Sequence, residues 1–357
     1  MKTDWTILQL CAVAGCAMAA LFMTASCKSL IFDDRSGCGH GVQMNFRYDY
    51  NLQRADMFDE HVGEVTVYVF DGQGRYVSTQ VVDCDSSPEA ADGTFVLDLP
   101  EGSYHLIALA QQDSYDGDAS APGAQFVRSE PGEGNYMTYV RVDLEAQDTD
   151  YYGGPKPIVH DGLPLDTVWH AWTPQPVTVG QVGYTEVDLS LVRNTKYISV
   201  SVRDLDGESR AADYDFTITD HNRYLLYDNS VDETDELLYT PFHTWDTEDR
   251  GSSEGSGVTA HAEFMTSRII YHDDPADDAR LRVVERAGGR TVIDVNLPDL
   301  LSSMASYDEL HRYSPQEFLD RGYDYRLSFY LVDGDWSYVT LTIGVLGWTK
   351  RIQNLDI

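Results

Sequence analysis

Few residues in this sequence have the type and spacing of a catalytic serine site. Residues 251–255 (GSSEG) match the Gly-x-Ser-x-Gly pattern of a nucleophile elbow. That motif needs a strand before the serine and a helix after it. Here the segment follows Glu-Asp-Arg and precedes Gly-Ser-Gly, which indicates a flexible linker and not an elbow.

The metal-binding and acid-base residues form no recognisable pattern either. None of the ten histidines has the His-Glu-x-x-His spacing of a zinc helix, so we expect His221, His243 and His261 to be surface or hydrogen-bonded residues. With 59 Asp and Glu residues, carboxylate pairs at glycosidase-like separation arise by chance. Acidic segments such as 116–118 and 228–236 lack the spacing of an EF-hand. We therefore predict no metal and no cofactor, and the sequence argues against an enzyme.

Cys27 is the residue with the clearest predicted chemistry. Lys2 precedes an uncharged stretch that extends to Cys27, as in a secretory signal. The small residues 24–26 before Cys27 resemble the lipobox of bacterial lipoproteins, in which the cysteine thiol carries the lipid; Thr24 stands where leucine is usual. We predict a signal peptide over residues 1–26 and a lipid on Cys27. A plain signal or a transmembrane helix is the alternative, because the stretch is near the ~20 residues that span a bilayer.

Two further cysteines remain in the predicted folded part. Cys38 and Cys84 are permitted to form one disulfide in an exported protein. Two residues provide no spacing pattern, so a pair of buried thiols is the equal alternative.

The charge of the chain excludes some partners. Lys and Arg number 25 against 59 Asp and Glu, a net charge of −34. Nucleic-acid binding depends on Lys and Arg that neutralise phosphates, so it is disfavoured. Anionic lipid head groups also repel such a chain, so attachment to a membrane needs a hydrophobic or covalent device. A hydrophobic content of 42% is nevertheless enough for folded cores.

The elements that must position any site are predicted to be strands. From Val42 to Tyr50 apolar and polar residues alternate, which is the period of a half-buried strand. Residues 65–82 and 94–110 each contain two apolar runs around a glycine-containing turn, as in a hairpin. Residues 111–135 are rich in Gly, Asp, Ser and Pro and indicate a surface loop, as do the acidic stretches 228–236 and 246–254.

The strand pattern repeats in the second half, which predicts two sandwiches and not alternating strands and helices. About 150 residues per domain also suggests two domains. After the signal we place a lipidated linker over residues 27–40, a first domain over 41–192 and a second over 193–357. In the second domain Ser314, Pro315 and Glu317 form a helix-capping pattern and Gly322 ends it. With residues 300–304 they predict a short helical insert.

The order of several segments resembles the FimB/Mfa-type fimbrial anchor family, the minor lipoprotein subunits of type V pili. The segments are spread over the chain: 33–34, Cys38, 41–42, FRYDYN (46–51), 55–58, VTVYVFD (65–71), DLSLVRNTKYISVSV (188–202), YDNS (227–230), 239–241, FMTSRI (264–269), 314–336 and the terminal Gly-Trp at 347–348. Their joint order carries the resemblance, since no single segment is specific.

The resemblance implies an adhesive structural role. Similar proteins have two tandem transthyretin-like β-sandwich domains and sit in the outer membrane through their lipid. They fix the base of a fimbria and influence its length, and the implied partners are the major shaft subunit and other fimbrial subunits. β-strand complementation between sandwiches would supply the contact through main-chain hydrogen bonds. One alternative is a surface lipoprotein adhesin that binds glycan or host protein through its loops, with a fimbrial tip as its expected position. The other is a secreted hydrolase.

The last segment is the predicted contact with a neighbouring subunit. A lipid on Cys27 ties down the first strand, whereas residues 336–357 are long enough for a strand and an extension. Up to Trp348 this segment is either the last strand of the second domain or a strand offered to a neighbour. Beyond it, Ile352, Leu355 and Ile357 are predicted to contact the adjoining subunit. Trp336 and Trp348 are predicted to serve the core or edge of the second domain.

Overall fold

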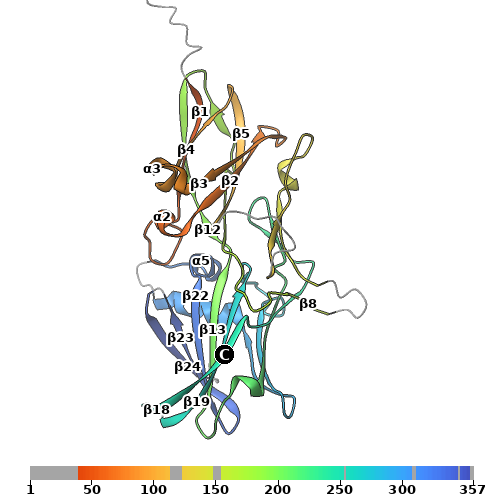
Figure 1. Ribbon diagram of the computed structural model, residues 1–357, viewed down its shortest axis with the longest axis vertical. Helices are drawn as coiled ribbons and strands as arrows, with labels where there is room; N and C mark the ends of the chain where they lie inside the picture. The colour runs from red at the N-terminus through yellow and green to blue at the C-terminus, as the bar shows by residue number, and fades with distance from the viewer. Residues whose placement is uncertain are drawn as a thin grey trace, which may run out of the picture.

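The structure, a computed structural model, describes residues 39–112, 123–147, 154–252, 255–307, 311–344 and 346–353. These residues form two β-sandwich domains, one above the other along the long axis of the molecule, with short helices between strands (Figure 1). The predicted fold class, all-β with two sandwiches and a helical insert in the second, is confirmed.

The first sandwich is built around the strand that the alternation predicts. β1 (His40–Arg47) lies between β11 (Gly183–Ser190), to which it is parallel, and β4 (Thr94–Asp98). Val42, Met44 and Phe46 point into the core, as their period of two requires. The facing sheet has the order β12 (Val192–Arg193), β9 (Val168–Trp172), β5 (Gly102–Gln111), β2 (Glu64–Asp71) and β3 (Tyr76–Asp83), with β10 (Val177–Val179) also on β5.

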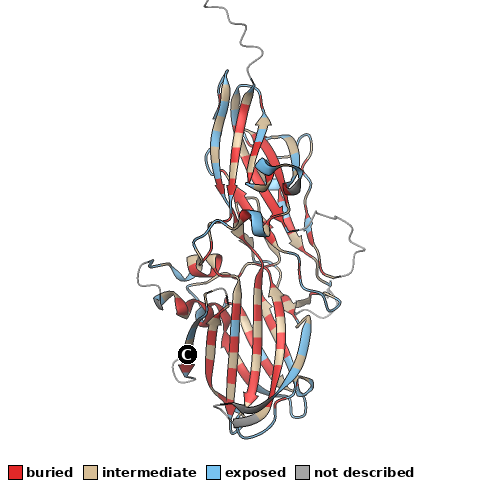
Figure 2. Cartoon of the chain, turned by 60° about the vertical axis from the view of Figure 1, so that its left-hand side comes forward, coloured by how far each residue is buried: buried red, intermediate tan, exposed pale blue. Residues whose placement is uncertain are grey.

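The second sandwich has a larger sheet with two long open edges. Its order is β18 (His243–Ser252), β19 (Gly255–Thr266), β13 (Lys196–Asp204), β22 (Asp324–Val332), β23 (Asp335–Ile343) and β24 (Trp348–Gln353). The facing sheet consists of β21 (Arg290–Asn296), β20 (Arg280–Glu285), β14 (Tyr214–Asp220), β17 (Leu237–Tyr239) and β8 (Lys156–Pro157). Buried and less buried residues alternate along these strands (Figure 2).

A segment of the first half contributes strands to the second half. β6 (Phe126–Arg128) and β7 (Arg141–Leu144) form a small sheet with β15 (Tyr224–Leu226) and β16 (Val231–Asp232), while β8 pairs with β17. The prediction of a loop over 111–135 is therefore wrong at β6, where Phe126 is buried. Strands this short do not produce a detectable period among Gly and Asp residues.

A second correction concerns the acidic and glycine-rich stretch 246–255. Residues up to Ser252 belong to β18, Gly255 begins β19, and the two strands pair antiparallel, so these residues are strands and not a linker. β18 is an edge strand on which Asp246 and Glu248 are exposed to water, which is why its composition resembles that of a loop. Part of the other acidic stretch forms β16.

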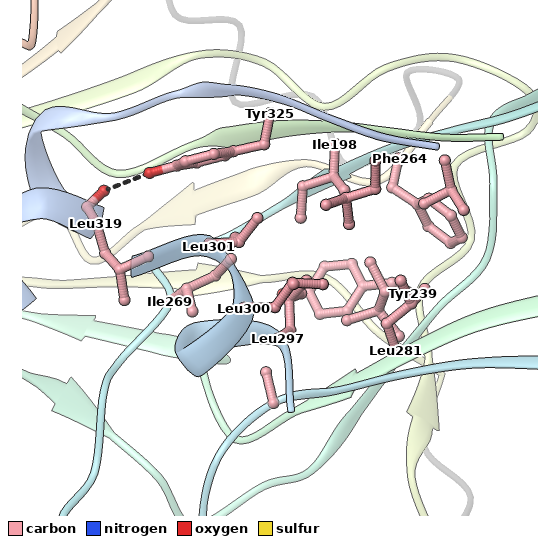
Figure 3. Packing of buried hydrophobic residues seen from close by; sticks show 14 of the residues in the cluster. Ile198, Tyr239, Phe264, Ile269, Leu281, Leu297, Leu300, Leu301, Leu319 and Tyr325 are labelled. Carbon is pink, nitrogen blue, oxygen red and sulfur yellow. Dashed lines mark hydrogen bonds between the residues drawn. The ribbon is translucent and has the colours of Figure 1, made fainter. Parts of the chain in front are cut away.

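The helices are short, and the predicted insert is present. α5 (Pro315–Arg321) begins after Ser314, whose hydroxyl accepts a hydrogen bond from Glu317 N at 3.1 Å, and Gly322 caps its end. α4 (Leu297–Ser302) places Leu297, Leu300 and Leu301 in the second core, against Ile198 and Tyr239 among others (Figure 3). The remaining helices are α2 (Phe58–His61), α3 (Pro88–Ala91), η2 (Cys84–Ser86), η3 (Met137–Tyr139), η4 (Ala211–Asp213) and η5 (Ser303–Tyr307).

Trp336 lies in the core of the second domain, one of the two places predicted for it. Its side chain is 8% exposed, and its ring meets Phe329 edge-on with centroids 5.6 Å apart. We expect Trp336→Ala to lower the free energy of unfolding by about 3–5 kcal/mol through lost burial and the cavity left behind. Urea unfolding of purified protein measures this, with the exposed Val332→Ala on the adjacent strand as control. Unchanged stability together with lost binding of a sugar or peptide would favour the adhesin role for Trp336.

Candidate functional site: domain junction and open strand edges

Several of the segments that carry the family resemblance meet between the two sandwiches. The chain crosses from β12 to β13 through residues 193–196, and α5 lies directly beside this crossing (Figure 1). Asn194 Nδ2 donates to Asn229 Oδ1 at 2.7 Å, which joins the crossing to the segment YDNS. His170 of the first sandwich contacts the carbonyl of Tyr227 at 3.0 Å. Burial lowers the pKa of His170 to about 4, so its ring is neutral at physiological pH.

Lys196 is the most deeply buried charged group of this junction. Its Nζ donates to three backbone carbonyls: Arg193 O at 3.0 Å, Asp320 O at 3.1 Å and Gly322 O at 2.8 Å. An ammonium group has three donors, so all of its protons are used. Burial lowers the pKa of Lys196 to about 7, while the nearby Asp320 carboxylate opposes the shift. The contacts attach the end of α5 to the start of β13.

A paired charge completes the junction on the side of the second sandwich. Arg268 Nε and Nη2 donate to the two carboxylate oxygens of Asp320 at 2.8 and 2.7 Å, and both side chains are largely buried. Arg268 also donates to the carbonyl of Asn229. The bidentate geometry is the strongest form of an Arg–carboxylate contact. It connects α5 to the segments FMTSRI and YDNS.

Aromatic side chains from both halves of the chain cover two further cations of the junction. The Arg193 guanidinium lies 5.4 Å from the Trp169 ring centroid and 4.3 Å from that of Tyr323. Arg321 of α5 lies 3.9 Å from the ring centroid of Tyr50. Cation–π contacts gain strength when they are removed from water. The two sandwiches thus share a buried polar and aromatic interface.

Of the six residues predicted to carry a lipid, a disulfide or a subunit contact, the structure places two. Cys84 is buried at the start of η2, whereas Cys27 and Cys38 lie outside the described residues, so both the lipid and the disulfide stay predictions. Ile352 is buried in the second core and pairs with Val339 of β23. Leu355 and Ile357 also lie outside the described residues.

The placement of β23 and β24 bears on the predicted tail contact. β23 is internal to its sheet, so residues 335–343 form a strand of this chain's own second domain. β24 is the edge strand, and its side chain at Ile352 is used by this chain's own core. A contact between the tail and a neighbour stays a prediction for the residues beyond β24.

The histidines do not converge on a metal. His243 and His261 stack on Trp245, with ring centroids 4.7 and 4.8 Å from it, while His221 follows β14 in the other sheet. Among the described residues no group of three or more His, Cys, Asp or Glu side chains is arranged to hold a metal ion. In the same part of the chain no helix is long and apolar enough to cross a membrane.

The open strand edges differ in how well they are protected against pairing with a strand of another chain. β18 carries Asp246 and Glu248, and β24 carries Lys350 and Arg351. Such charges hinder pairing with another chain. β3 has no charge from Tyr76 to Val82. Two of its valines are exposed, Val77 at 43% and Val81 at 53%. β3 is therefore the least protected long edge in the described part of the chain.

The outer backbone of β3 already makes one hydrogen bond. Tyr76 N donates outward to Asn135 O at 2.9 Å. A β-bulge at Val77 shifts the register by one residue, so the alternation restarts beyond it. Cys84 N donates inward to Gly63 O, and counting back from it by twos leaves the N–H groups of Thr79, Val81 and Asp83 facing outward. No further strand among those described pairs with this side. The edge therefore has the geometry to accept a strand from another subunit.

Sequence reasoning missed both parts of this site. Arg268 and Asp320 are 52 residues apart, and no local pattern predicts that they pair. The edge of β3 had a signal, namely a run of strand-forming residues without a charge, but sequence does not reveal which strands lie at an edge.

Comparisons with known proteins agree with this architecture. Residues 35–354 match the sequence profile of the family described as fimbrillin-A associated anchor proteins Mfa1 and Mfa2. A solved structure of a candidate adhesin from Bacteroides thetaiotaomicron is 28% identical and superposes with a TM-score of 0.70, covering 88% of this chain and 99% of that one. The fimbrial anchor protein Mfa2 from Porphyromonas gingivalis is 17% identical with a TM-score of 0.54, covering 87% and 98%.

Proposed function

The chain belongs to the family of fimbrillin-A associated anchor proteins Mfa1 and Mfa2, and from this premise we propose that it attaches the base of a fimbria to the outer membrane and influences the length of the fimbria. The match over residues 35–354 carries the proposal, because it spans both sandwiches and the junction between them. The partners are the shaft subunit and other subunits of the same fimbria.

Attachment to the membrane is assigned to a lipid on Cys27. With a net charge of −34 the folded body gains nothing from an anionic bilayer surface. Each buried CH₂ of an acyl chain contributes ~0.8 kcal/mol, and stable anchoring needs two or more chains or a second signal. A lipidated cysteine ahead of β1 supplies such an anchor and leaves both sandwiches free for protein contacts.

Attachment to the fimbria is assigned to strand addition at β3. A strand from the shaft subunit would pair with the outer N–H and C=O groups from Thr79 onward. Val77 and Val81 would then lose contact with water, and each fully buried valine contributes about 1.5–3 kcal/mol. Main-chain hydrogen bonds supply the rest of the contact and place few demands on the partner's sequence.

This assignment predicts that Val81→Lys weakens the complex with the shaft subunit. A lysine at an exposed edge position hinders strand pairing and leaves the fold intact. Thr349→Lys on the edge strand β24 adds the same charge at another edge and is the matched control. We expect the Val81 variant, and not the control, to lose the shaft protein after mild crosslinking and co-purification. Equal recovery of the shaft protein with both variants would exclude β3 as the contact.

An adhesin that binds glycan or host protein is the second candidate function. It is favoured by the 28% identity to the candidate adhesin, which extends over nearly the whole of both chains. The two functions differ in position: a base subunit co-purifies with the cell envelope after fimbriae are sheared off, whereas a tip subunit leaves with the fimbriae.

A further inference from the structure

β1 crosses the first sandwich along the long axis of the molecule. It begins at His40, at the end of the molecule farthest from the second sandwich, and runs toward the junction (Figure 1). Shortly beyond its last residue, Arg47, the ring of Tyr50 lies 3.9 Å from the Arg321 guanidinium of α5. A pull on the start of β1, directed away from the second sandwich, therefore acts along the axis of this strand.

Both sides of β1 are paired. It is parallel to β11 over its whole length, from His40 opposite Gly183 to Arg47 opposite Ser190, without a register shift. It is antiparallel to β4 over residues 41–45. The hydrogen bonds between strands run across the strand direction. A force along β1 therefore loads both ladders at once, and their bonds have to break together and not one after another.

The side chains of β1 also oppose sliding. Val42, Met44 and Phe46 are at most 1% exposed in the first core. A shift of the strand by one residue would turn all three from the core toward water. On the outer face Asn45 Nδ2 donates to Asp188 Oδ1 of β11 at 3.2 Å. β1 is thus held by its ladders, by its buried face and by its outer face.

β11 connects β1 to the rest of the molecule. β11 runs in the same direction as β1, and the chain continues from it into β12 and then into β13 of the second sandwich. β12 also pairs with β9, in the sheet whose opposite edge is β3. A force that reaches β11 is therefore carried along the chain to the second sandwich and across a sheet to β3.

We propose that β1, held between β11 and β4, is the mechanical clamp of this protein and bears the tension between the N-terminal tether and the folded body. This role rests on the proposed function, in which the tether ends in a lipid on Cys27 and the folded body holds a fimbria. It goes beyond attachment, because it assigns the strand whose pairing determines how long the fold survives under load. The clamp works in the same way whether the shaft subunit binds β3 or the second sandwich.

Magnetic tweezers at constant force test this role on the full mature chain without its lipid. One handle is a tag ahead of residue 27, and the other is attached to the exposed side chain at Gln80 of β3. Cys27→Ser and Cys38→Ser remove the thiols that would compete with engineered cysteines. The measured quantity is the lifetime of the folded state at a fixed force.

A reversible cross-link between β1 and β11 is the decisive change. Gln43→Cys and Glu186→Cys place two thiols at register partners on the outer face. We expect oxidation to lengthen the lifetime at least about tenfold and reduction to restore it. The control cross-link, Ser328→Cys with Thr340→Cys, joins β22 to β23 off the load path and should leave the lifetime unchanged. Equal lifetimes of the oxidised and reduced β1–β11 cross-link would overturn the clamp.

Two buried methionines provide a second test. Met44 lies in β1 and Met304 in the second core, and both are fully buried. Under this load Met44→Ala should shorten the lifetime about tenfold or more, whereas Met304→Ala should not, although both variants lose the same side chain. Equal shortening in both variants, or none in either, would contradict the clamp. The pulled chain carries neither lipid nor shaft subunit, so these results are separate from the membrane retention that tests the anchor function.

Discussion

Asp320→Asn is expected to lower the free energy of unfolding by about 3–5 kcal/mol, because it removes one partner of a buried ion pair and leaves Arg268 without its counter-charge. Asparagine keeps the size of the side chain, so the loss is electrostatic and not a packing defect. The same change removes the carboxylate that favours the charged form of Lys196.

Urea unfolding followed by tryptophan fluorescence measures this loss. Asp215→Asn is the matched control, since it breaks an exposed pair with Arg286 and should cost at most about 1 kcal/mol. If the two variants lose the same small amount, the junction does not depend on the Arg268–Asp320 pair. A second unfolding transition in Asp320→Asn alone would indicate that the pair couples the two sandwiches.

Cys27→Ala is expected to abolish retention of the protein in the membrane, which is the largest change in localisation that a single substitution can produce here. Without acyl chains nothing else in the acidic folded body favours a bilayer. Membrane fractionation of whole cells and N-terminal analysis of the product measure the effect. Cys16→Ala, a substitution in the predicted signal itself, is the control and should be retained and processed normally. Unchanged fractionation and processing of the Cys27 variant would contradict lipidation.

The sandwiches could be predicted because the alternation of apolar and polar residues in their longest strands shows which face of each strand is buried. Residues 42–46 alternate, and their apolar members are buried as the period requires. The capping pattern at Ser314 likewise specifies where α5 begins, since all of its parts are local.

Other elements were missed for physical reasons. β6 and β8 are too short for a period, and pairing with β7 and β17 stabilises them. β18 has the composition of a loop because Asp246 and Glu248 remain in water at a sheet edge. The role of Ile352 could not be predicted without knowing how β24 pairs with β23. The pairing of Ile352 with Val339 shows that this side chain belongs to the core.

The junction was missed because it is a product of the tertiary fold. Lys196 is surrounded by carbonyls from residues 193, 320 and 322, and two of these are more than 120 positions away. Segments that appeared only as family landmarks thus have a common physical role, which is to join the two sandwiches.

The proposed function is that this chain links a fimbria to the outer membrane. The most direct test is to locate the shaft subunit in cells that produce the Cys27→Ala variant. Quantitative immunoblotting of shaft protein in washed cells and in cell-free medium provides it. We predict that the shaft protein moves from the cells to the medium and co-purifies there with the variant. Shaft protein that stays on the cells while the variant is released would contradict the anchor function.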